Sequence, residues 1–102
     1  MEHLTGRVWL RSPEEETGSV RVYRPKGYPF PPARGREGLV FHDDGRFEYL
    51  MPGRDDRPSG ATGHWQAEAE GGRVRADVAG QVVELRITDV AQDVLRLEWL
   101  IP

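Results

Sequence analysis

Short runs of alternating apolar and polar residues follow one another along the chain, and helical periodicity is almost absent. Successive side chains of a β-strand point to opposite faces, so this alternation is typical of strands buried on one face. The fourth run shows it plainly, with Phe47 and Tyr49 on one face and Glu48 on the other. The alternation predicts eight strands, at 6–11, 18–23, 38–42, 46–51, 63–69, 73–79, 81–88 and 94–100.

The segments between these runs are rich in residues that favour turns. Residues 43–45, 70–72 and 79–80 place glycine where a hairpin needs a positive φ. After the first strand, Ser12 as N-cap followed by Pro13 predicts one helical turn. Eight short strands joined in this way predict an all-β fold, a small antiparallel up-and-down β-barrel, because closing the sheet removes its exposed edges.

Composition narrows the function classes. The 102 residues suit one domain, 1–102, and the absence of cysteine excludes disulfides, thiolate metal sites and cysteine nucleophiles. A net charge of −3, with both signs interspersed, gives no footprint for nucleic acid. No apolar run approaches the length of a membrane span, so we expect no membrane partner and a cytoplasmic protein. A homodimer is left open.

Several motifs together resemble a known family of small barrels. They are Gly6-x-x-Trp9, Phe41-x-Asp43-Asp44-Gly45-x-Phe47, Gly63-His64-Trp65 and the final hairpin LRITDVAQDVLRLEW. This pattern, which covers Leu4 to Leu100, resembles the bacterial lipocalin-like domains, small relatives of the calycin barrels. The resemblance implies a calycin-type barrel that binds a small apolar ligand.

Catalytic and metal chemistry have little support in the sequence. His42, Asp43 and Asp44 stand together, but Asp and Gly dominate hairpin turns for conformational reasons alone, so we expect a turn and neither metal nor cofactor there. No serine or threonine lies in a nucleophile elbow. Binding is therefore favoured over catalysis. If the protein were a small barrel cyclase or isomerase, His64 would be its acid or base, directed into the cavity.

A proline-rich segment, RPKGYPFPPARGREG, interrupts the strand pattern. If consecutive strands alternate in direction, loops 24–37 and 52–62 meet at one rim of the barrel. Aromatic groups there would contact an apolar ligand, and guanidinium groups would bind an anion that it carries. The candidate ligand-binding residues are Tyr28, Phe30, Arg34, Arg36, Arg57, His64 and Trp65.

Two other interpretations of this rim stay open. The prolines could make segment 24–37 a semi-rigid plug, with Tyr28 and Phe30 closing the barrel end permanently. Alternatively, the same rim could dock another protein, which would make the chain a non-catalytic interaction module. Inside the barrel, small residues such as Ala67, Ala69 and Ala76 either leave space for a ligand or make room for tryptophans, and close packing favours the second.

Overall fold

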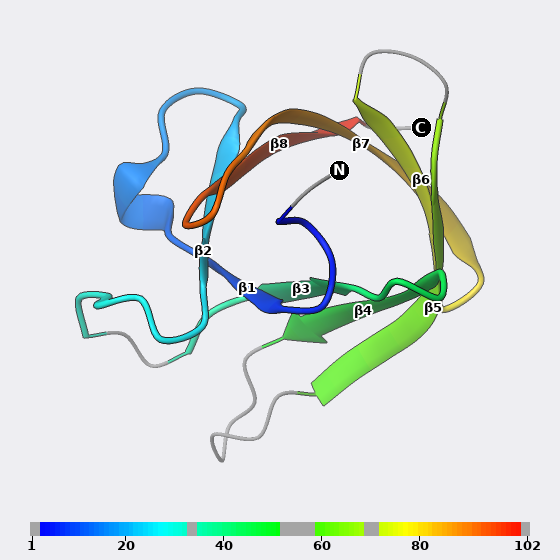
Figure 1. The fold of residues 1–102 in the computed structure, drawn as a ribbon, viewed down its shortest axis with the longest axis horizontal. Helices are drawn as coiled ribbons and strands as arrows, with labels where there is room; N and C mark the ends of the chain where they lie inside the picture. The colour runs from blue at the N-terminus through cyan, green and yellow to red at the C-terminus, as the bar shows by residue number, and fades with distance from the viewer. Residues whose placement is uncertain (1–2, 33–34, 52–58, 69–71, 101–102) are drawn as a thin grey trace.

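A computed structural model describes residues 3–32, 35–51, 59–68 and 72–100, and it shows a closed barrel of eight antiparallel strands (Figure 1). The strands are β1 (Val8–Arg11), β2 (Arg21–Pro25), β3 (Gly38–Phe41), β4 (Arg46–Met51), β5 (Ser59–Ala67), β6 (Arg73–Val78), β7 (Gln81–Val90) and β8 (Leu95–Leu100). The predicted up-and-down antiparallel β-barrel is confirmed. Within the described ranges, no helix has the length and apolar character needed to cross a membrane.

The boundaries of most strands agree with the alternation, and β5 shows why some do not. β4 has the predicted bounds, whereas β5 begins at Ser59, ahead of the predicted 63. Its first residues carry no large apolar side chain, so they give no alternating signal, yet they pair in register with the second half of β4. The predicted helical turn is present as a short 3-10 helix, η1 (Pro13–Glu15).

The order of strands around the barrel departs from the sequence at one place. It runs β1-β2-β8-β7-β6-β5-β4-β3, and β3 closes on β1. Trp9 of β1 pairs with Pro25 on one side and with Leu39 on the other, and both pairings are antiparallel. β2 and β3 therefore run in the same direction. The expectation that all consecutive strands alternate in direction is wrong here, because β1 occupies the position between them.

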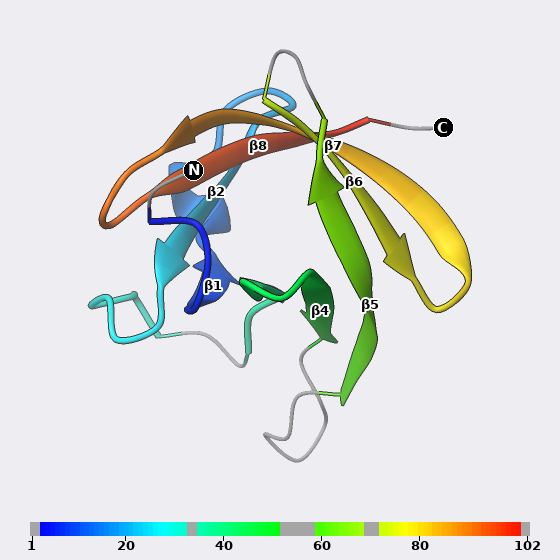
Figure 2. The same ribbon diagram turned by 45° about the vertical axis from the view of Figure 1, so that its right-hand side comes forward.

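Residues 26–37, which we call the strap, connect opposite ends of the barrel as a result. The strap begins where the Lys26 N–H donates to the carbonyl of Val8, at the start of β1. It ends where Arg36 donates to the carbonyl of Arg11, at the end of β1. Figures 1 and 2 both show its described part outside the ring of strands. The strap thus crosses the outer side of β1. Only its final residues lie at the end of the barrel where β4 finishes.

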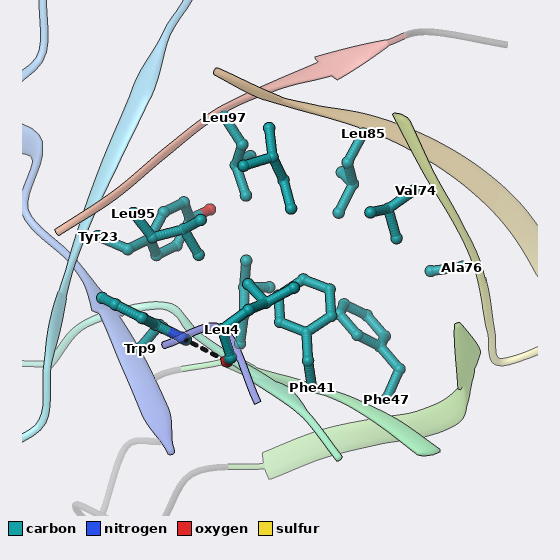
Figure 3. Close-up of a cluster of buried hydrophobic side chains, with 12 residues drawn as sticks. Leu4, Trp9, Tyr23, Phe41, Phe47, Val74, Ala76, Leu85, Leu95 and Leu97 are labelled. Carbon is teal, nitrogen blue, oxygen red and sulfur yellow. Dashed lines mark hydrogen bonds between the residues drawn. The ribbon is translucent and has the colours of Figure 1, made fainter. Parts of the chain in front are cut away.

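The two ends of the barrel differ. At the plugged end, where β1 and β8 begin, the N-terminal segment turns inward and buries Leu4 completely. The indole N–H of Trp9 donates to the Leu4 carbonyl at 2.9 Å (Figure 3). The Gly6 N–H donates to the Phe41 carbonyl at 3.0 Å. We call the opposite end, where β4, β6 and β8 finish, the pocket end.

The core fills the barrel from the plugged end upward. Figure 3 shows side chains from strands all around the barrel converging on its axis. Trp9, Tyr23, Phe41 and Phe47 are fully buried there. Ala76 is fully buried opposite Trp65 in the sheet register, which agrees with making room for a tryptophan, whereas Ala67 is exposed and does not contribute to the interior. Ala69 lies outside the described residues. At the level of these side chains, the protein's own atoms fill the interior by close packing.

Candidate functional site

The core gives way to an open pocket at the pocket end. Its volume is about 420 Å³, and it is lined by Arg21, Tyr49, Val78, Ala79, Gln81, Val83 and Trp99. We call it the mouth pocket. Arg21 lies two positions before the buried Tyr23, and Trp99 lies two positions after the buried Leu97. Because side chains two apart on a strand share a face, the strands that build the core also direct these residues inward, further along the barrel.

Aromatic groups form one wall of the mouth pocket. The rings of Tyr49 and Trp99 meet edge to face, with their centroids 6.1 Å apart. The guanidinium of Arg21 lies over the Trp99 ring, 5.3 Å from its centroid. A cation over an indole face is attracted by the ring's negative face, so Trp99 helps to keep the charge of Arg21 at the pocket.

A half-buried group of hydrogen bonds adjoins the pocket and centres on Glu37, the last residue of the strap. Nη1 of Arg21 donates to Glu37 Oε1 at 3.2 Å, and the hydroxyl of Tyr23 donates to the same oxygen at 2.6 Å. Nη1 of Arg11 lies 3.7 Å from the other carboxylate oxygen. The side chain of Glu37 is only 13% exposed. The Trp99 indole N–H donates to the Tyr23 oxygen at 3.3 Å, which links this group to the pocket wall.

The protonation states of this group follow from burial and from neighbouring charge. Burial, and then the negative charge of Glu37, raise the pKa of Tyr49, and the same two causes raise the pKa of Tyr23. Both hydroxyls are therefore protonated near neutral pH and act as donors. Burial alone would raise the pKa of Glu16, but hydrogen bonds from Arg11 and the Val22 N–H outweigh it and lower that pKa.

The two arginines at this end have different partners. Arg11 donates from Nε and Nη2 to the two carboxylate oxygens of Glu16, at 2.9 and 2.8 Å. Within the part of the chain that the structure describes, Glu37 is the one carboxylate paired with Arg21. A guanidinium has five N–H donors, more than one carboxylate accepts. Arg21 is therefore the cation that can still bind a ligand.

Three of the expected site residues lie together in the strap rather than in the mouth pocket. Tyr28 and Phe30 pack edge to face at 5.1 Å. The guanidinium of Arg24 lies over Tyr28, and that of Arg36 lies over Phe30 at 4.3 Å. Arg36 also donates to Glu14 and to main-chain carbonyls. These contacts hold the strap against the outside of the barrel, so it neither plugs the mouth nor lines it within its described residues.

The other expected site residues are not brought to this end. Trp65 faces inward near the plugged end, where it packs on Phe41 and donates to the carbonyl of His42 at 2.9 Å. His64, its neighbour, is exposed on the outer face of β5, opposite Asp77. The acid or base of a barrel enzyme would need His64 inside the cavity, and strand alternation places it outside. Arg34 and Arg57 lie outside the described residues.

Sequence reasoning missed the residues that line the pocket. Arg21 and Gln81 carry the signal that could have found them, because they are polar residues in phase with the inward positions of β2 and β7. Polar residues at the ends of an apolar face mark a solvated end of the interior. Trp99 is also in phase with the inward positions of its strand, but an inward tryptophan in a sequence is ordinarily interpreted as part of the core.

The histidine turn is an ordinary hairpin turn in the structure. Gly45 has φ +93°, and the Arg46 N–H donates to Asp44 Oδ1 at 3.1 Å. His42 Nε2 lies 2.5 Å from Glu48 Oε2. Among the described residues, no group of three histidine, aspartate or glutamate side chains is arranged to hold a metal ion.

The fold and the site define a small antiparallel barrel that is packed and plugged at one end and open to an aromatic pocket at the other. Comparison with protein-family models, with curated proteins and with solved structures finds no match.

Proposed function

We propose that the protein is a small-molecule binding protein and that its ligand, apolar or aromatic in its main part, occupies the mouth pocket. The observation that carries this proposal is the open pocket of about 420 Å³ with aromatic walls and one arginine. Ligand pockets in proteins range from about 300 to 1,000 Å³, and the mouths of β-barrels are favoured places for them. A pocket near the lower limit suits a ligand of one or two rings.

The lining supports binding over catalysis. Val78 and Val83 offer apolar contact, while Tyr49 and Trp99 offer aromatic surface. Arg21 and Gln81 supply the few polar groups that orient a ligand in such a pocket. Glu37 is not available as a base, because Arg21 and Tyr23 already donate to it.

The family and the location are part of the same proposal. A closed eight-stranded barrel occurs in unrelated families, so membership of the lipocalin-like domains rests on the motifs from Gly6 to Trp99. The pocket at one end of the barrel is consistent with that membership. We propose the cytoplasm as the location because the chain has no cysteine and does not need an oxidising compartment, and cell fractionation tests this.

A pair of neighbouring valines tests the proposal. Val83 lines the mouth pocket, whereas Val82 is 48% exposed on the outer face. N-phenyl-1-naphthylamine, an uncharged probe that fluoresces in apolar sites, should bind the wild type. Val83→Phe should weaken its binding by about tenfold or more because the added ring fills the pocket, while Val82→Phe adds the same volume outside and should change binding less than about twofold.

Fluorescence titration distinguishes the outcomes. Absence of binding to the wild type, or equal weakening by the two variants, would contradict a site in the mouth pocket. If the probe does not bind and a protein from the native host is instead retained by the wild type and lost on Val83→Phe, the same end of the barrel is a protein interface.

A further inference from the structure

If the mouth pocket binds a ligand as proposed, the charges around Arg21 determine what charge that ligand can carry. An arginine in an apolar pocket ordinarily indicates an anionic ligand. In the mouth pocket, however, Arg21 already faces a carboxylate of the protein, since its Nη1 lies 3.2 and 3.4 Å from the two oxygens of Glu37. The side chain of Glu37 is 13% exposed, so solvent screens its charge poorly.

The other charges around this end are balanced as well. Arg11 and Glu16 form a second pair, with Nη2 of Arg11 at 2.8 Å from the carboxylate. The Arg36–Glu14 pair lies beside them, so the described charged groups here are three arginines and three glutamates. A carboxylate bound to Arg21 would lie within a few ångströms of Glu37, and Coulomb repulsion at that distance is comparable to the attraction that Arg21 offers. The ligand carboxylate would also lose its hydration on entering the pocket.

We propose that Glu37 is a specificity-determining residue of the mouth pocket, and that by neutralising Arg21 it makes the pocket select uncharged ligands that carry a carbonyl-type acceptor over carboxylates. The donors fit this class. The N–H groups of Arg21 that Glu37 does not accept can donate to a ligand carbonyl, and the amide of Gln81 can complete its orientation. An uncharged acceptor gains these hydrogen bonds without facing the repulsion of Glu37.

The position of Glu37 gives this selection a fixed geometry. Glu37 directly precedes β3, and the preceding strap residue, Arg36, is held by Glu14 and by the carbonyl of Arg11. Tyr23 donates a second hydrogen bond to Glu37 from the core. The carboxylate is therefore held in place on both sides, and a ligand anion cannot displace it without breaking contacts of the fold.

Two ligands of nearly equal shape test the proposal, 1-naphthamide and 1-naphthoate, each measured by competition with N-phenyl-1-naphthylamine. The wild type should bind the amide more tightly than the carboxylate. Glu37→Gln keeps the shape of the side chain and removes its charge, so it should tighten naphthoate binding by about tenfold or more while naphthamide changes less than about twofold. Glu84→Gln makes the same change on the outer face of β7, away from the pocket lining, and should leave the ratio unchanged.

A measurement on the wild type covers the case in which Glu37→Gln does not fold. Because the pocket charges are balanced, naphthoate binding should change less than about twofold between about 20 mM and 500 mM salt, whereas a cationic pocket would lose affinity steeply. Tighter binding of naphthoate than naphthamide to the wild type, or steep salt dependence, would overturn the proposal. If neither ligand competes with the bound probe, the acceptor assignment is wrong while the mouth pocket stands. Failure of the probe itself is failure of the proposed function.

Discussion

Gly63 shows how one residue sets the course of a strand in this barrel. A Cβ atom at this position would lie 1.5 Å from the carbonyl oxygen of Asp77 and 2.6 Å from its carbon. Both atoms belong to the backbone of β6, so neither can move aside as a side chain could. Glycine is therefore required at position 63 so that β5 can approach β6 closely. This position follows the residues of β5 that pair with the second half of β4, and it precedes the inward-facing Trp65.

Replacement of Gly63 should destabilise the fold severely. We expect Gly63→Ala to lower the free energy of unfolding by about 3 kcal/mol or more, because the added methyl group forces two backbones apart. Gly18→Ala is the matched control. Gly18 has φ +66° with open space around it, so alanine there should cost only about 1 kcal/mol of backbone strain. Urea unfolding measures both, and equal losses would show that β5 and β6 separate easily.

Single residues also show which contacts cannot be predicted from the sequence. Arg21 and Trp99 are far apart in the chain, and nothing local to either indicates that they meet. Their contact depends on the register of β2 with β8, in which Arg21 lies opposite Leu97. An aromatic pocket with one arginine is thus a property of the register, which alternation alone does not determine.

At the scale of elements, two ion pairs connect η1 to the strap, one directly through Arg36 and one through Arg24 of β2, whose guanidinium lies over Tyr28 of the strap. Arg36 donates to both carboxylate oxygens of Glu14, and Arg24 donates to both oxygens of Glu15. The hydrogen bond from Arg36 is the main cause that lowers the pKa of Glu14 to about 2, and the one from Arg24 lowers the pKa of Glu15. Both carboxylates are therefore charged near neutral pH, where they hold the strap.

The only lysine of the chain, Lys26, lies at the exposed start of the strap, so cleavage at Lys26 reports how firmly the strap is held. A lysine-specific protease can cut the chain nowhere else. In the double variant Glu14→Gln, Glu15→Gln we expect cleavage under native conditions to be about threefold faster or more, because local opening of the strap costs less free energy. Glu84→Gln, on the outer face of β7, should not change the rate. Mass spectrometry follows the cut chain, and equal rates would show that the aromatic stacking alone holds the strap.

The elements themselves were largely predictable from the sequence, and their connection at β1 was not. Alternation and turn glycines located all the strands, because burial on one face leaves a period of two. Short connections then predicted the hairpins β3–β4, β5–β6 and β6–β7. The long strap carries no such signal, since a connection of this length can join neighbours or cross a strand. The assumption that it joined neighbours placed Tyr28 and Phe30 at a rim they do not occupy.

At the scale of the whole molecule, the two ends of the barrel differ in the kind of residues that they gather. The plugged end stabilises the fold through Leu4, which is fully buried beside Trp9 near the barrel axis. The pocket end forms the proposed ligand site, where polar residues replace the core. If the proposed function holds, stability and binding depend on different residues at opposite ends.

This separation predicts that the plug can be weakened without changing the site. Leu4→Ala should lower the free energy of unfolding by about 2–5 kcal/mol because it leaves a cavity in a packed core. Binding of N-phenyl-1-naphthylamine to the folded fraction should change less than about twofold. Met51→Ala, which truncates a side chain 52% exposed, should change stability by no more than about 0.5 kcal/mol. A large loss of probe binding in Leu4→Ala would show that the two ends are coupled.

The placement of β1 has a consequence for how the chain can be divided. β2-β8-β7-β6-β5-β4-β3 is a continuous sheet without β1, and β2 and β3 are then its two edges. Residues 3–11 carry both the plug and the strand that fits between those edges. The barrel is therefore organised as a seven-stranded receptor and a short peptide that completes it, and a cut in the connection around η1 would make it a two-fragment protein that reassembles by strand insertion.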